Sequence, residues 1–103
     1  MRRFLCLTAA LSLGATGAHA AKASQFAGSE LLPHAKVTLA QARSTALKVR
    51  PGRITDQELE KESGGTGLRY SFDIKSKGKT FEVGVDARTG KILENDREGP
   101  HPD

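Results

Sequence analysis

An alternation of apolar and polar residues in the second half of the chain restricts its fold more than any other feature of the sequence. Apolar side chains occupy every second position from Leu68 to Ile74, and the same spacing resumes from Phe81 to Val85. A period of two places these side chains on one face of a strand and the charged ones on the other. The short loop around Gly78 joins the two runs, so they predict a β-hairpin with one apolar face.

Further strands are expected on both sides of this hairpin. In "ELEKE", the glutamates at 58, 60 and 62 alternate with Leu59 and Lys61, which suits a strand with a charged outer face, although a short helix fits the same residues. The glycine-rich "GGTG" then connects this segment to the hairpin. After the hairpin, "DARTG" predicts a turn in which Asp86 accepts hydrogen bonds from backbone amides. A last short strand is expected to begin at Lys91.

One helix is expected before the strands. Thr38 and Gln41 have the spacing of a capping box, in which each side chain binds a backbone N–H group of the first turn. Small and aliphatic residues then recur at helical spacing, and Pro51 predicts the end of the helix. The apolar stripe of this helix consists of Leu39, Ala42, Ala46 and Val49.

The helix stripe and the one-faced sheet each need a cover, and each can cover the other. The predicted fold class is therefore α+β, with one amphipathic helix packed on one face of a three- to four-stranded antiparallel sheet. The residues expected in the core are Leu39, Ala42, Ala46, Leu47, Val49, Ile54, Leu59, Leu68, Tyr70, Phe72, Ile74, Phe81, Val83, Val85 and Ile92.

The beginning of the chain has the three-part layout of a secretory signal peptide. Arg2 and Arg3 precede an apolar run that is too short for a transmembrane helix, and small residues end the segment. Cleavage is expected after Ala20, with Ala23 as an alternative. We therefore expect a periplasmic or secreted protein without stable membrane insertion after cleavage. The single cysteine, Cys6, lies within the predicted signal, so no disulfide is expected in the mature chain.

The pattern divides the chain into a signal peptide at 1–20, a flexible N-terminal arm at 21–36, the folded domain at 37–94 and a C-terminal tail at 95–103. The arm lacks a sustained period, although Phe26, Leu31 and Leu32 are candidates for docking onto the domain. The tail has no apolar period and contains two prolines, which predicts a loose end.

No catalytic, cofactor-binding or metal-binding residues are predicted. The sequence contains no Gly-x-Ser-x-Gly nucleophile motif, and "GGTG" lacks the Lys-Ser/Thr of a phosphate-binding loop. Glu58, Glu60 and Glu62 are expected to pair with basic neighbours, because a catalytic carboxylate pair needs a cleft that a domain this small has little material to build. His34 and His101 are expected in solvent-exposed end segments, where a shared metal site would require both ends to converge.

The formal net charge of +4 includes Arg2 and Arg3, which leave with the predicted signal. The densest basic stretch contains Lys75, Lys77 and Lys79, and we expect it to be a solvated hairpin turn. Nucleic-acid binding is not expected, since no basic face is accompanied by aromatic residues for stacking.

Residues 37–94 resemble the PepSY domain in the order of their segments. The shared features are an alanine-rich capped helix, a Pro-Gly break, the "ELEKE" strand, a strand of alternating aromatic residues and "FEVGVDARTGKIL". The most specific part is "VGVDARTGKIL", in which Gly84 stands where a bulkier residue is common in the family. This departure is expected to flatten or weaken the outer face of its strand.

The resemblance implies a domain without catalytic residues or cofactors of its own, found in peptidase propeptides and in small exported proteins. It implies a protein-binding module that regulates or inhibits a peptidase or another envelope protein. An unpaired sheet edge that accepts an extended segment is one way in which such a module could bind its partner. The alternative is a structural, ligand-sensing or stress-sensing envelope protein that has the fold without the peptidase connection. Neither the partner nor the oligomeric state follows from the resemblance.

Overall fold

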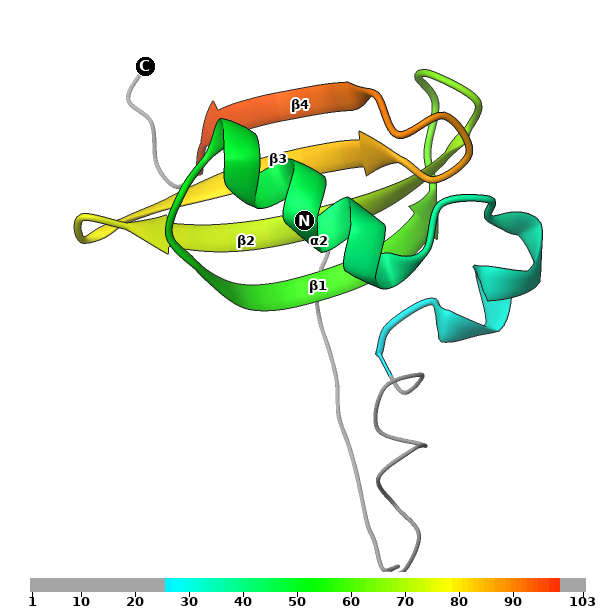
Figure 1. Cartoon of the computed structure of the whole chain (residues 1–103), viewed down its shortest axis with the longest axis horizontal. Helices are drawn as coiled ribbons and strands as arrows, with labels where there is room; N and C mark the ends of the chain where they lie inside the picture. Colours follow the sequence, from blue (N-terminus) through cyan, green and yellow to red (C-terminus); the bar gives the residue numbers. More distant parts are fainter. Residues whose placement is uncertain (1–25, 99–103) are drawn as a thin grey trace, which may run out of the picture.

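In the computed structural model, which describes residues 26–98, one α-helix lies across a four-stranded antiparallel sheet (Figure 1). The four strands pair in chain order, each with the next. This arrangement confirms the predicted α+β fold class. The elements are η1 (Ser29–His34), α2 (Leu39–Val49), β1 (Arg53–Lys61), β2 (Leu68–Ser76), β3 (Lys79–Asp86) and β4 (Ile92–Arg97).

Helix α2 begins at the predicted capping box and covers one face of the sheet. The Gln41 backbone N–H donates to the Thr38 hydroxyl at 3.1 Å, and the Thr38 backbone N–H donates to the Gln41 side chain at 2.8 Å. Val49 was expected in the core, but it is 39% exposed. Its place over the sheet is taken by Arg50, whose guanidinium carbon lies 3.9 Å from the ring centroid of Phe81.

The core lies between α2 and the covered face of the sheet. Tyr70 and Phe72 stack there with ring centroids 6.3 Å apart, and the Tyr70 hydroxyl donates to the Val37 carbonyl oxygen at 2.7 Å. Ala87 is also buried, and its backbone forms hydrogen bonds with those of Leu68 and Val37. Strand alternation did not predict this burial, because Ala87 follows the end of β3. The buried hydrophobic residues are Ala42, Ala46, Leu59, Leu68, Tyr70, Phe72, Ile74, Val83, Val85 and Ala87.

The "ELEKE" segment is a strand, as expected, and not a short helix. It lies at the end of β1, where Leu59 is buried on the covered face and pairs with Tyr70 of β2. The register shifts between Ile54 and Asp56, which forms a bulge near the start of the strand. The bulge keeps Ile54 against the core and Asp56 on the opposite face.

The segment before α2 packs against β1, although it was expected to be a flexible arm. Phe26, Leu31 and Leu32, the candidates for docking, pack against the core. The carbonyl oxygen of Ala27 accepts from the Leu59 backbone N–H at 2.9 Å, in a parallel bridge beside β1. At Gly28 the backbones approach so closely that an added Cβ atom would lie 1.7 Å from the Leu59 carbonyl oxygen.

Strand β4 continues to Arg97, into the stretch that was expected to be a loose tail. Backbone pairing with β3, rather than apolar burial, holds this part of the strand, so the apolar period gave no sign of it. The predicted signal peptide, residues 21–25 of the predicted arm and residues 99–103 lie outside the described residues. Within residues 26–98, no helix is long and apolar enough to cross a membrane.

Candidate interaction surface

The face of the sheet turned away from α2, here called the open face, is rich in carboxylates. Strand register aligns Asp56, Asp73, Glu82 and Asp96 in one row across all four strands. The basic residues whose alternation places them on this face are Arg53, Arg69 and Lys75. The acidic residues of the open face are Asp56, Glu58, Glu60, Asp73, Glu82, Asp86, Glu94, Asp96 and Glu98.

Arg69 is the buried cation of the open face and explains the unusual Gly84. The Arg69 guanidinium donates to Glu94 at 3.1 Å and to the Ser63 carbonyl oxygen at 3.3 Å, and the residue is 7% exposed. A Cβ atom on Gly84 would lie 3.0 Å from one guanidinium nitrogen. Gly84 therefore leaves space for Arg69 to reach across β3 to β4, and the expected weakening of this face is offset by the ion pair between Arg69 and the half-buried Glu94.

Asp86 organises two loops, of which the sequence predicted one. As expected, its Oδ1 accepts from the backbone N–H groups of Arg88 at 2.8 Å and Thr89 at 3.0 Å, within the turn that it opens. In the glycine-rich connection before β2, the Thr66 backbone N–H donates to the Asp86 Oδ2 at 2.7 Å, and the Thr66 hydroxyl donates to the Asp86 Oδ1 at 2.8 Å. Asp86 thus has a structural role at the junction of these loops, as four donors converge on its carboxylate.

These hydrogen bonds control the charge of Asp86. Burial alone raises the pKa of this carboxyl, but the donors from Thr66, Arg88 and Thr89 stabilise the ionised form more strongly. The balance lowers the pKa from 3.8 to about 2. The carboxylate is therefore ionised in the folded protein at every pH above that value.

Three carboxylates on the open face approach one another closely. Oxygen atoms of Asp73, Glu82 and Glu98 all lie within 4.8 Å of one another. Asp73 and Glu82 also have other interactions within the fold. The sequence gave no indication of this cluster, because it depends on the pairing of β2 with β3 and on the hydrogen bond from the Glu98 backbone N–H to Thr80. The cluster makes this part of the open face strongly negative.

The other residues weighed as candidate ligands or acids do not form a common site among the described residues. His34 ends η1 and is exposed, while His101 lies outside the described residues. Glu58 and Glu60 project from the same face of β1, and Glu60 accepts a hydrogen bond from Ser71 at 2.8 Å. Glu62 follows the end of β1 and is exposed.

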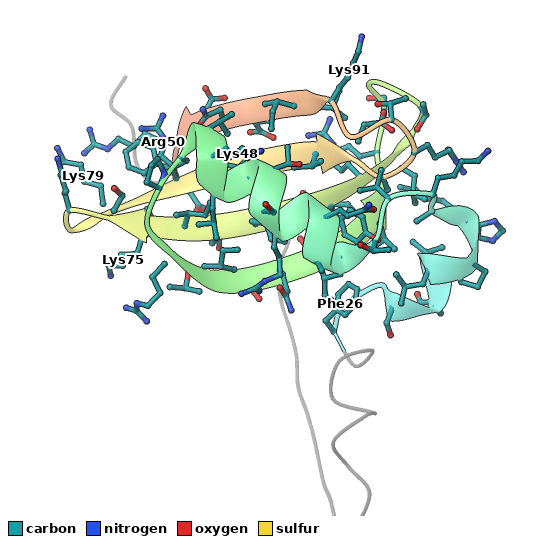
Figure 2. All side chains as sticks on the ribbon, in the orientation of Figure 1. Phe26, Lys48, Arg50, Lys75, Lys79 and Lys91 are labelled. Carbon is teal, nitrogen blue, oxygen red and sulfur yellow. The ribbon has the colours of Figure 1, made fainter. Side chains whose placement is uncertain are left out.

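A groove with a volume of about 370 Å³ lies beside the first half of β1. Phe26 is one of the residues that line it, and Figure 2 shows the Phe26 side chain below α2 in this view. The Arg43 side chain reaches from α2 across the groove wall and donates to the Gln57 side chain. The lining residues are Phe26, Ala27, Arg43, Ile54, Thr55, Asp56 and Gln57.

Basic side chains gather at the opposite end of the sheet from the glycine-rich connection. Lys75 and Lys79 project from the hairpin end of β2 and β3, with Arg50 on the adjacent end of α2 (Figure 2). Lys75, Lys77 and Lys79 are all exposed, as expected for a solvated hairpin turn. Carboxylates thus outnumber cations on the open face, while exposed cations gather around the hairpin, and Lys75 belongs to both regions.

The two edges of the sheet differ. The edge of β1 is partly occupied, because the Leu59 backbone N–H binds Ala27 and the Gln57 backbone N–H binds the Asp56 side chain at 3.0 Å. Strand β4 forms the other edge and, among the described elements, packs only against β3 and α2. The edge of β4 is therefore the one that is open to a further strand.

Comparison with known families gives a match that covers most of the described residues. The PepSY family, described as "Peptidase propeptide and YPEB domain", matches residues 36–96. The matched interval contains α2 and β1–β3 entirely and β4 to its penultimate residue, and it is slightly longer than the predicted domain at 37–94. Neither the curated proteins nor the solved structures give a significant match.

Proposed function

The chain belongs to the PepSY family, and from this membership we propose that it is an exported, non-catalytic protein-binding module that regulates or inhibits a peptidase or another envelope protein. The observation that carries the proposal is the family match over residues 36–96, since PepSY is a peptidase-propeptide-like module. A partner would be a separate molecule, engaged through the surface of the folded domain.

The use of polar side chains within the fold supports a binding role. Asp86 holds two loops together, and Arg69 bridges β2 to Glu94 of β4. Ser71, a potential nucleophile by residue type, donates its hydroxyl to Glu60. These three side chains therefore have structural partners within the described residues. The features available for contact with another protein are the surface charge and the edge of the sheet.

The first test measures the effect of the purified protein on proteolysis. We expect it to slow at least one secreted or envelope peptidase of the same organism in a concentration-dependent way, and to bind that enzyme directly in a calorimetric titration. An unrelated exported protein of similar size and charge serves as the control. If no peptidase from the secreted or envelope fractions is slowed and none binds, the peptidase-regulating role is wrong.

A second test separates this role from a structural or sensing one. A strain lacking the protein should show altered secreted or envelope proteolysis if the protein regulates a peptidase. A strain with unchanged proteolysis and altered tolerance of envelope stress would instead support the sensing alternative. Fractionation and N-terminal sequencing of the expressed protein test the proposed export, for which we expect Ala21 as the first residue.

A further inference from the structure

The backbone of β4 has hydrogen-bonding groups that face away from the sheet. Along an edge strand of an antiparallel sheet, the backbone N–H and C=O groups of successive residues point alternately toward the neighbouring strand and away from it. In β3 and β4, the Glu98 backbone N–H donates to the Thr80 carbonyl oxygen at 2.8 Å. Counting back in steps of two, the pairs of Asp96 with Glu82 and of Glu94 with Gly84 are also hydrogen-bonded pairs. The N–H and C=O groups of Asn95 and Arg97 therefore point outward, where an added strand would bind them.

The two sides of this edge differ in chemistry. On the open face, Asp96 and Glu98 have no basic partner among residues 26–98, and Asp96 lies opposite another carboxylate, Glu82. On the covered side, Ile92 is half-buried at the start of β4, and Val49 is 39% exposed at the end of α2. The Asn95 side chain donates to the Val49 carbonyl oxygen at 3.5 Å, which places this apolar residue next to β4.

We propose that β4 accepts an extended, basic segment of a partner protein as a fifth strand of the sheet. Alternate residues of that segment would be lysine or arginine and would lie over Asp96 and Glu98 on the open face. The intervening residues would be apolar and would contact Val49 and Ile92 on the covered side. This inference rests on the proposed binding function and names the kind of segment that the module would recognise.

Charge also distinguishes this partner from a second copy of the chain. Antiparallel pairing of two β4 strands would bring Glu94 and Asp96 of one copy next to the same residues of the other. Like charges directly opposite on neighbouring strands are destabilising. The edge therefore disfavours self-association and favours a cationic strand.

The test uses synthetic peptides and the isotope-labelled protein expressed from the full chain. The probe is an end-capped peptide of eight residues in which lysine and valine alternate. One control peptide has glutamate in place of lysine, and another has a fully N-methylated backbone. We expect the lysine–valine peptide to shift and protect the amide signals of Asn95 and Arg97. Both control peptides should bind at least tenfold more weakly.

Protein variants separate backbone pairing from general electrostatic attraction. Arg97→Pro removes an outward N–H group at an edge position where proline is tolerated, and it should abolish peptide binding, while Arg97→Ala should retain it. Asp96→Asn with Glu98→Gln should weaken binding roughly three- to tenfold. The matched pair Glu30→Gln with Glu58→Gln, which removes the same charge from η1 and β1 at the other side of the sheet, should leave affinity unchanged. Thermal melting of each variant checks that the fold is intact.

Several results would overturn the inference. The β4 site is wrong if the N-methylated peptide binds as well as its parent, if both charge pairs reduce affinity equally, or if none of the peptides binds at millimolar concentration. A peptidase that binds the wild type and the Arg97→Pro variant equally would refute the edge site and leave the proposed function intact. Peptide binding at β4 without any effect on a peptidase or other envelope partner would refute the proposed function and leave the edge site intact.

Discussion

Replacement of Asp86 by asparagine tests whether one buried carboxylate stabilises the junction between two loops. Asp86 is 1% exposed and accepts four hydrogen bonds from Thr66, Arg88 and Thr89. Its pKa is lowered from 3.8 to about 2, which corresponds to about 2 kcal/mol of folding free energy at neutral pH. An asparagine amide also turns an NH₂ group toward a donor, and a buried donor without a partner costs about 1 to 3 kcal/mol. We therefore expect Asp86→Asn to lose about 3 to 5 kcal/mol near pH 7.

The pH dependence follows from the sign of the shift. The folded-state pKa of Asp86 is below its usual value of 3.8. The ionised carboxylate therefore adds its full stabilisation to the free energy of unfolding above pH values near 4, and this stabilisation is lost as the pH falls toward about 2. Urea denaturation of the wild type and of Asp86→Asn, measured at intervals from pH 7 to pH 2, should show a free-energy difference that shrinks by about 2 kcal/mol. The exposed Asp96→Asn serves as the control and should differ little from the wild type across this range. A difference for Asp86→Asn that stays constant from pH 7 to pH 2 would refute the reasoning.

Four further substitutions test other parts of the fold by urea denaturation or hydrogen exchange. Phe72→Ala should lose about 3 to 5 kcal/mol, because the ring is fully buried against the helix, and unchanged stability would mean that the covered face is assigned wrongly. Gly28→Ala should release the segment before α2 and raise hydrogen exchange at Leu59, since the added methyl group clashes with the β1 backbone. Gly67→Ala, also at positive φ but with open space around it, should cost only about 1 kcal/mol. Thr38→Ala should cost about 1 kcal/mol through loss of the helix cap, and an effect below the error of the measurement would contradict that role.

Local patterns predicted most of the fold because they depend on neighbouring residues alone. The capping box at Thr38, the alternation from Leu68 to Val85 and the strand character of "ELEKE" all correspond to elements of the structure. The misassigned residues depend on contacts between distant segments. Val49 is exposed because Arg50 occupies the surface of Phe81.

The features of the candidate surface were less predictable, since they come from register and long-range contacts. The sequence predicted that Asp86 binds its own turn, because that contact spans three residues. Its bonds to Thr66 span 20 residues and had no sequence signal. The same holds for Gly84, whose role becomes clear only when Arg69 is seen to lie across it toward Glu94.

Net charge is a poor guide to the partner of this protein, because the charges are distributed unevenly. The chain has a formal net charge of +4, which alone would suggest an acidic partner. Nine of its 12 acidic residues nevertheless lie on the open face, while Arg50, Lys77 and Lys79 gather around the hairpin end. A partner within the screening length of roughly 8 Å responds to the local field and not to the total charge. The open face and the edge of β4 therefore attract a cationic segment even though the whole chain is positive, and this attraction should weaken as salt concentration rises.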